Sequence, residues 1–170
     1  MISQPARRIR HLALIAVIAV VASACSSQPS VAPTVKNDRR VVLQPRATRA
    51  IGERAATVAL GQLGVPYRYG GSSPTGFDCS GLVHYAYANV GKSVPRTTTG
   101  LWSELAPIDR EDVRIGDLLF FSIAGKMSHV GMYLGRREFV HAPSTGRFVS
   151  VESLDSDYYS RAFIRAGRPR

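Results

Sequence analysis

The segment from Tyr67 to Val90, YRYGGSSPTGFDCSGLVHYAYANV, constrains the fold most, because a Gly-, Ser- and Pro-rich stretch runs directly into a helical pattern. Residues 70–76 cannot continue a helix or a strand, and Asp78 is a favoured N-cap residue. Apolar residues at 82, 83, 86 and 90 then share one helical face, which Gly91 is placed to end. Cys79 therefore falls in the first helical turn, where free N–H groups and the helix dipole favour a thiolate.

A cysteine at such a position is by itself more often a small buried apolar residue than a nucleophile, so the rest of the chain has to decide. The chain has 170 residues, enough for one domain with a hydrophobic core. Its net charge of +10 is uneven, since residues 1–50 hold eight Lys or Arg and one acidic residue. No basic motif with interleaved aromatic residues is present, so we expect no nucleic-acid partner.

The N-terminus has the layout of a secretory signal peptide over residues 1–24. Three arginines precede an apolar run from Leu12 to Val21, and the small residues Ala22-Ser23-Ala24 follow. The run is too short for a membrane-spanning helix. Cys25 then resembles the lipidated cysteine of a bacterial lipobox, although Ala22 stands where a lipobox usually has Leu. Ala-x-Ala also suits ordinary signal peptidase, so a lipid anchor at Cys25 and a soluble periplasmic form are both open.

An exported chain can form disulfides, and Cys25–Cys79 is the only pair available. If Cys25 is acylated through sulfur, Cys79 has no partner and persists for its chemistry. Residues 25–48 lack periodicity and predict a flexible tether. The domain then spans residues 49–170 and opens with a helix from about Arg49 to Leu63.

The remaining pattern predicts an α+β fold with helices first and an antiparallel sheet after them. Thr97 or Thr98 can cap a short helix that reaches about Leu105. Residues 118–121 form a buried strand, and 128–134 with 138–142 form a hairpin. Further strands are expected at 147–152 and 162–166.

The hairpin sets the relation between two histidines. A three-residue loop at 135–137 places Leu134 opposite Glu138, and His129 and His141 then become diagonal neighbours on one sheet face. A two-residue turn would put them on opposite faces. Together with Cys79 they have the form of a Cys–His pair and an orienting third residue. A zinc site from the same three residues is less favoured, because it lacks close paired spacing and would occupy the only thiol.

Residues from about 50 to 166 resemble the NlpC family of bacterial cell-wall cysteine peptidases, which are papain-like in fold. The matching segments, in chain order, are YRYGG at 67–71, FDCSGLV at 77–83, VPRT at 94–97, GDL at 116–118, HVGMYLG at 129–135 and FVHA at 139–142. The short layout with a candidate lipid anchor is similar to that of the Spr-type murein endopeptidase lipoproteins.

The resemblance implies Cys79 as nucleophile, His129 as base and His141 as the third member. It implies that Tyr67 lies at the active site, and that Asp78 and Ser80 border the groove and bind a free amine of the stem peptide. Plain helix capping is an equal reading for Asp78.

We therefore expect a monomeric endopeptidase of peptidoglycan stem peptides, without a metal or another cofactor, attached by lipid to the outer membrane and facing the periplasm. The bond is either the D-Ala–diaminopimelate cross-link or the D-glutamyl–diaminopimelate bond. A lipid acyl-transfer enzyme of related fold and a non-catalytic wall-binding lipoprotein are the alternatives. The short polar loop before Cys79 disfavours the first, and the intact Cys79, His129 and His141 set disfavours the second.

Overall fold

The computed structural model describes the backbone of residues 39–170 and the side chains of residues 50–170. The predicted signal peptide, Cys25 and the first part of the predicted tether lie outside this range. Among the described residues, no helix is both long enough and apolar enough to cross a membrane.

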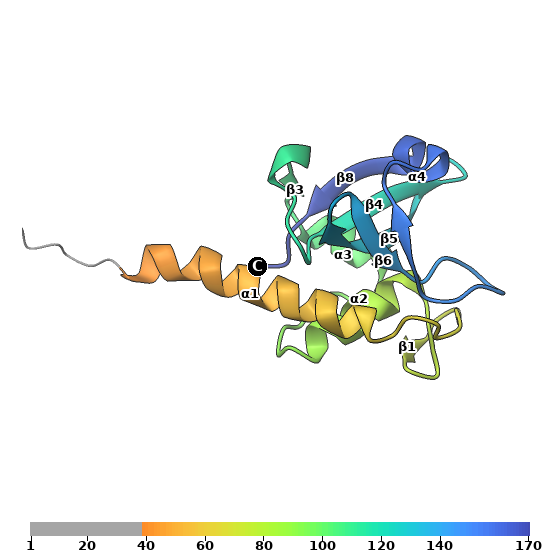
Figure 1. Cartoon of the computed structure of the whole chain (residues 1–170), viewed down its shortest axis with the longest axis horizontal. Coiled ribbons are helices and arrows are strands. Elements are labelled where there is room, and N and C mark those ends of the chain that lie inside the picture. The colour runs from red at the N-terminus through yellow and green to blue at the C-terminus, as the bar shows by residue number, and fades with distance from the viewer. Residues whose placement is uncertain (1–38) are drawn as a thin grey trace, which may run out of the picture. The chain divides into compact units, whose positions relative to one another are not determined.

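Helix α1 spans Arg39–Leu60, so it begins ten residues before the predicted start, and residues 39–48 are helical rather than an irregular tether. The Arg, Leu, Gln and Ala residues of this stretch have good helix propensities, which explains the extension even though Pro45 lacks a backbone donor. Ala55, Ala56 and Ala59 form the buried side of α1 and pack in the same core as helix α2, Cys79–Ala88. The small alanine side chains let the two helices lie close together (Figure 1).

Six strands form an antiparallel sheet in the order β3-β8-β4-β5-β6-β7. Their bounds are β3 Pro107–Ile108, β4 Leu118–Ile123, β5 Lys126–Gly135, β6 Glu138–His141, β7 Ser150–Ser153 and β8 Phe163–Gly167. A small hairpin, β1 Ser72–Ser73 and β2 Gly76–Phe77, precedes α2. Short helices are α3 Thr98–Glu104, η1 Arg110–Asp112 and α4 Asp157–Ala162. The α+β class and the five predicted strand regions are confirmed, whereas the β1–β2 hairpin, β3, η1 and α4 were not expected.

Both faces of the sheet are covered, and strand β4 shows how. Leu118 and Phe120 join the core that contains α1, α2 and α3, while Leu119 and Phe121 join a second cluster on the opposite face beside α4. Burial on both faces explains why the sequence of β4 is a continuous apolar run rather than an alternating one. Figure 1 shows α1 and α2 together on one side of the sheet and α4 on the other.

The β5–β6 turn differs from the prediction. Gly135 pairs with Glu138, so the turn has two residues, Arg136 and Arg137, both with positive φ (51° and 61°). That geometry is the type I′ turn, whose twist matches a hairpin. The predicted three-residue loop is therefore wrong.

The predicted pairing of β5 with β6 near the histidines is nevertheless correct, because β5 contains a bulge. The register shifts between Tyr133 and Gly135, after which Met132 pairs with Val140. The extra residue of the bulge cancels the missing residue of the turn. His129 and His141 consequently lie on the same sheet face, as predicted.

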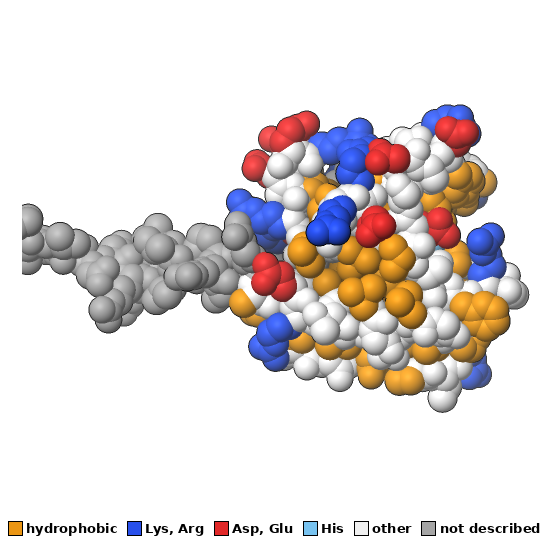
Figure 2. All heavy atoms as spheres, in the orientation of Figure 1, with side chains coloured by type: hydrophobic (Ala, Val, Ile, Leu, Met, Phe, Trp, Pro, Cys, Tyr) orange, Lys and Arg blue, Asp and Glu red, His pale blue; other side chains and the backbone are white. Residues whose placement is uncertain are grey.

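Charged side chains of both signs are interspersed over the face of the domain shown in Figure 2, and apolar side chains gather between them. A nucleic-acid-binding face would instead concentrate Lys and Arg in one patch.

Candidate active site

Cys79 is the first residue of α2, as the sequence predicts. Asp78 is the N-cap, with extended backbone angles (φ −91°, ψ 176°), and its Oδ1 accepts a hydrogen bond from the Gly81 N–H at 2.6 Å. The Cys79 N–H belongs to the first turn, where N–H groups have no acceptor within the helix. The thiol and a free backbone donor are thus presented together.

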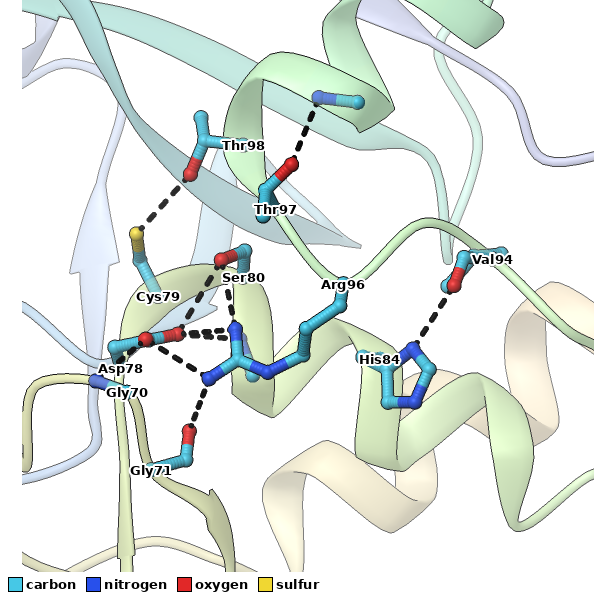
Figure 3. A network of polar contacts seen from close by, with 12 residues as sticks. Gly70, Gly71, Asp78, Cys79, Ser80, His84, Val94, Arg96, Thr97 and Thr98 are labelled. Atoms are coloured by element: carbon cyan, nitrogen blue, oxygen red, sulfur yellow. Dashed lines mark hydrogen bonds and ion pairs between the residues drawn. The ribbon is translucent and has the colours of Figure 1, made fainter.

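Arg96 forms a bidentate ion pair with the Asp78 carboxylate. Its Nη1 and Nη2 donate to Oδ1 and Oδ2 of Asp78, each at 2.9 Å, and they also reach Ser80 Oγ (3.1 Å) and Gly71 O (2.9 Å) (Figure 3). The Gly70 N–H donates to Asp78 Oδ2 at 2.9 Å. Both carboxylate oxygens are therefore occupied by groups of the protein itself, which supports the capping role of Asp78.

The ionisation of Asp78 follows from the same contacts. Burial acts to raise its pKa, but the hydrogen bonds from Arg96 and Gly81 outweigh burial, so the pKa lies below its ordinary value. Ser80 is buried and donates to Asp78 Oδ1 at 3.3 Å. Ser80 thus belongs to this network, and substrate binding by Asp78 and Ser80 stays a prediction.

Close backbone packing holds the loop of residues 70–71 against the start of α2. A Cβ added to Gly81 would lie 2.0 Å from the Gly71 carbonyl oxygen, closer than any real contact. The Asp78 N–H donates to that same oxygen at 3.0 Å. Only glycine fits at position 81. Because Gly81 has no side chain, the loop can pack directly against the first turn of α2, which carries Cys79.

The two histidines meet as predicted. His129 Nε2 and His141 Nδ1 are 2.8 Å apart, with His129 6% exposed and His141 fully buried. The rings of Phe139 and Tyr159 contact His141 edge to face. Burial lowers the pKa of His129 to about 4 and that of His141 to about 3, so both imidazoles are neutral at neutral pH.

The hydrogen bond between the rings fixes which nitrogen can act as a base. A neutral imidazole has one N–H and one lone pair. If His129 Nε2 donates to His141 Nδ1, then Nδ1 of His129 carries the free lone pair. The opposite arrangement would leave His129 with no nitrogen able to accept a proton from the thiol. Base catalysis by His129 therefore requires His141 as the acceptor.

The Val130 N–H, one residue after His129, acts to lower the pKa of Cys79, so the thiol lies near the backbone of the strand that carries His129. Burial nevertheless raises the pKa of Cys79, and the hydrogen bonds from Thr98, Val130 and Ser80 offset it only in part. The sequence-based expectation of a lowered thiol pKa is therefore wrong, because desolvation outweighs the helix start. The pKa shifts of Cys79 and His129 therefore favour a protonated thiol and a neutral imidazole in the free protein.

Tyr67 is half-buried at the same site. Its N–H donates to the Arg147 carbonyl at 2.8 Å, which ties the segment before the glycine loop to the β6–β7 connection. Burial and then the electrostatic influence of Cys79 raise the pKa of the Tyr67 hydroxyl. The hydroxyl stays protonated and is able to donate a hydrogen bond.

Sequence reasoning gave Arg96 and Thr98 no role at the active site, although it considered Thr98 as a helix cap. Thr98 Oγ1 lies 3.6 Å from Cys79 Sγ (Figure 3). Arg96 lies within VPRT and Thr98 directly follows it, but separations of 18 residues between Asp78 and Arg96 and 19 residues between Cys79 and Thr98 carry no periodic signal. Residues 50–170 contain no group of three His, Cys, Asp or Glu side chains arranged to hold a metal ion.

A thiol at a helix start and a buried histidine pair on an antiparallel sheet define an α+β domain of the cysteine peptidase type. The chain belongs to the NlpC/P60 family, whose model matches residues 64–168. It is 43% identical over 132 residues to the murein DD-endopeptidase MepH of Escherichia coli strain K12, covering 72% of this chain and 49% of that protein. It spans about half the length of the first curated relatives it matches.

Solved structures agree with this assignment. An NlpC/P60 family protein from Bacillus cereus is 31% identical, with a TM-score of 0.65 over 69% of this chain and 40% of that one. The P60 domain of an antigen from M. avium subspecies paratuberculosis is 30% identical, with a TM-score of 0.62 over 72% of this chain and 96% of that one. The near-complete coverage of the second structure shows that the domain described here is a whole family domain.

The buried histidines give the fold a predictable response to acid. Above about pH 6.5 both rings are neutral whether the chain is folded or unfolded. Below about pH 6.5 the two imidazoles become protonated in the unfolded chain, whereas in the folded chain they stay neutral down to about pH 4. The free energy of unfolding should fall over that window by about 1.4 kcal/mol per pH unit for each histidine. Urea unfolding at several pH values measures the slope, and His141→Asn should halve it. An unchanged slope in that variant would show that His141 is not buried in neutral form.

Proposed function

We propose that this protein is a cysteine endopeptidase that cleaves the stem peptides of peptidoglycan. The observation that carries the proposal is the 2.8 Å contact of His129 Nε2 with His141 Nδ1, which leaves His129 Nδ1 available to the thiol at the start of α2. A non-catalytic wall-binding protein has no need of two buried neutral histidines at a free thiol.

The proposed reaction begins from the neutral pair. As Cys79 Sγ bonds to the substrate carbonyl carbon, its proton passes to His129 Nδ1, and the Nε2–H bond to His141 stabilises the resulting imidazolium. The oxyanion accepts hydrogen bonds from the Cys79 N–H and the Tyr67 hydroxyl. The C–N bond then breaks, and the leaving amine takes the proton from His129. Water attacks the thioester carbonyl and gives a proton to His129. The C–S bond then breaks, the carboxyl product leaves, and the sulfur takes the proton back from His129.

The bond we favour is the cross-link between D-Ala and the D-centre of diaminopimelate. The relative at 43% identity is named a murein DD-endopeptidase, a name that refers to a bond between two D-configured centres. The D-glutamyl–diaminopimelate bond joins a D-residue to an L-centre and is the second candidate.

Digestion of purified sacculi, followed by mass analysis of the muropeptides, tests both points. Cleavage of cross-links converts dimeric muropeptides into monomers with complete stems, whereas cleavage after D-glutamate shortens the stems. The Cys79→Ala protein serves as the matched control for co-purifying hydrolases. Muropeptides unchanged by the wild-type protein would refute the proposed activity.

We further propose that the protein is exported and held in the cell envelope by a lipid at Cys25. The support is the basic, apolar and small-residue order of residues 1–24, with a cysteine directly after it. The family domain matches from residue 64 onward, so Cys25 and the domain are separate parts of the chain.

A lipid at Cys25 predicts that the mature protein sediments with membranes and that Cys25→Ala releases it or blocks its processing. One acyl chain gives only marginal binding, so stable sedimentation requires more than one. Membrane fractionation and intact mass spectrometry measure both properties. A mature N-terminus at an unmodified Cys25 would mean that ordinary signal peptidase makes the cut.

A further inference from the structure

Two neighbouring threonines at the start of α3 do different things. Thr97 is the N-cap, and its Oγ1 accepts a hydrogen bond from the Gly100 N–H at 3.1 Å. The hydroxyl of Thr98 does not cap the helix but points to the nucleophile, with Oγ1 3.6 Å from Cys79 Sγ. Figure 3 shows the two side chains directed to these separate partners.

The position of Thr98 is held by its own chain. Arg96, two residues earlier, bonds to Asp78 and Ser80 at the start of α2 and to the carbonyl of Gly71 in the loop packed against it. These side-chain contacts of Arg96 tie the start of α3 to the start of α2. The backbone position of Thr98, held through Arg96, therefore helps to set the distance between the Thr98 hydroxyl and Cys79 Sγ.

We propose that Thr98 is a positioning residue for the nucleophile: its hydroxyl donates a hydrogen bond to Cys79 Sγ and stabilises the thiolate that forms during attack. The donor direction follows from the proton balance. The thiol proton is used toward His129 Nδ1, so the sulfur offers only lone pairs to its other neighbours, Thr98 and the Val130 N–H. A hydrogen bond to a charged acceptor is stronger than one to a neutral acceptor.

This role predicts when Thr98 acts. The sulfur is most negative as its proton leaves, and it loses that charge once the bond to the acyl carbon has formed. The Thr98 hydrogen bond therefore favours thiolate formation before attack and thiolate departure when the thioester is hydrolysed, and it contributes little while the acyl group stays bound to sulfur. The inference deepens the proposed function, but it concerns the thiol and so can be tested without peptidoglycan.

A purely steric role for Thr98 makes a different prediction. Thr98→Val keeps the branched shape and removes the hydroxyl, whereas Thr98→Ser keeps the hydroxyl and removes a methyl group. Thr97→Val is the matched control on the adjacent residue, because it removes a cap rather than a contact with sulfur. The control should lower the unfolding temperature by about 3 °C and leave the thiol unchanged.

The test is the pH dependence of iodoacetamide alkylation of the full chain, read at the Cys79 peptide by mass spectrometry so that Cys25 does not interfere. Thr98→Val should raise the apparent thiol pKa by about one unit. Because a more basic thiolate is also more nucleophilic, alkylation at pH 7 should fall about threefold while the high-pH plateau rises about threefold. Thr98→Ser and Thr97→Val should both follow the wild-type curve.

An unchanged curve for Thr98→Val, or an equal shift for Thr97→Val, would overturn the inference in favour of packing. An equal rise of the thiol pKa in Thr98→Val and Thr98→Ser would also overturn the inference, because Thr98→Ser keeps the hydroxyl. A shift in the pH dependence of Cys79 alkylation would support the role of Thr98 even if the wild-type protein failed to digest sacculi. That failure would refute only the proposed function.

Discussion

Cys79→Ala is expected to abolish the digestion of sacculi, with a loss of about four orders of magnitude or more, while the domain stays folded. The side chain is small and already packed beside Thr98 and the Val130 N–H, so its truncation leaves only a small cavity. Muropeptide release measures activity, and thermal unfolding measures the fold. Activity that persists in this variant would remove Cys79 from the mechanism.

Cys79→Ser should be nearly as inactive as Cys79→Ala. A hydroxyl is far less acidic than a thiol, and burial lowers the pKa of His129 to about 4, which makes that ring a weak base. A site built this way can deprotonate a thiol during attack but not an alcohol. Substantial digestion by the serine variant would indicate that His129 is more basic in the substrate complex than in the free protein.

The second large effect separates the two histidines. His129→Ala should reduce activity on the scale of Cys79→Ala, because both acylation and deacylation lose their proton acceptor. His141→Asn should keep a measurable fraction, since the Asn Oδ1 stands one bond from Cγ, as Nδ1 does in histidine, and can accept from His129 Nε2. His141→Gln can also accept but has to bend its longer chain, so we expect it to retain less.

The comparison is made by muropeptide release at several pH values, with thermal unfolding to correct for the fraction folded. If His141→Asn is as inactive as His129→Ala while folded, the assigned tautomer is wrong. If His129→Ala retains more activity than His141→Asn, the roles are reversed.

Much of the site could be predicted because local signals agreed with each other. A loop rich in glycine, an N-cap at Asp78 and a periodic apolar face placed Cys79 at a helix start, and the structure has it there. The predicted hairpin register placed the histidines on one face, and the β5 bulge preserves that register although the predicted three-residue loop was wrong. The class of fold followed from the order of helices and strands.

The rest depended on contacts between segments far apart in the chain. The thiol pKa is set by how much of the domain covers Cys79, which no local motif contains. Arg96 and Thr98 reach the nucleophile only because α3 folds back on α2, and one arginine after a proline gives no sign of that. The early start of α1 was not predicted, because residues 39–48 show no apolar periodicity and include Pro45.

The β5 bulge makes the histidine pair independent of the turn that joins its strands. His129 and His141 are twelve residues apart, and that count is what keeps both rings on one face. A two-residue turn with a bulge and a three-residue loop without one contain the same number of residues. The hairpin can therefore exchange one form for the other, and replace the two arginines at its tip, without displacing either ring. An insertion or deletion confined to the turn would instead carry one histidine to the opposite face, unless a second change in β5 restored the count.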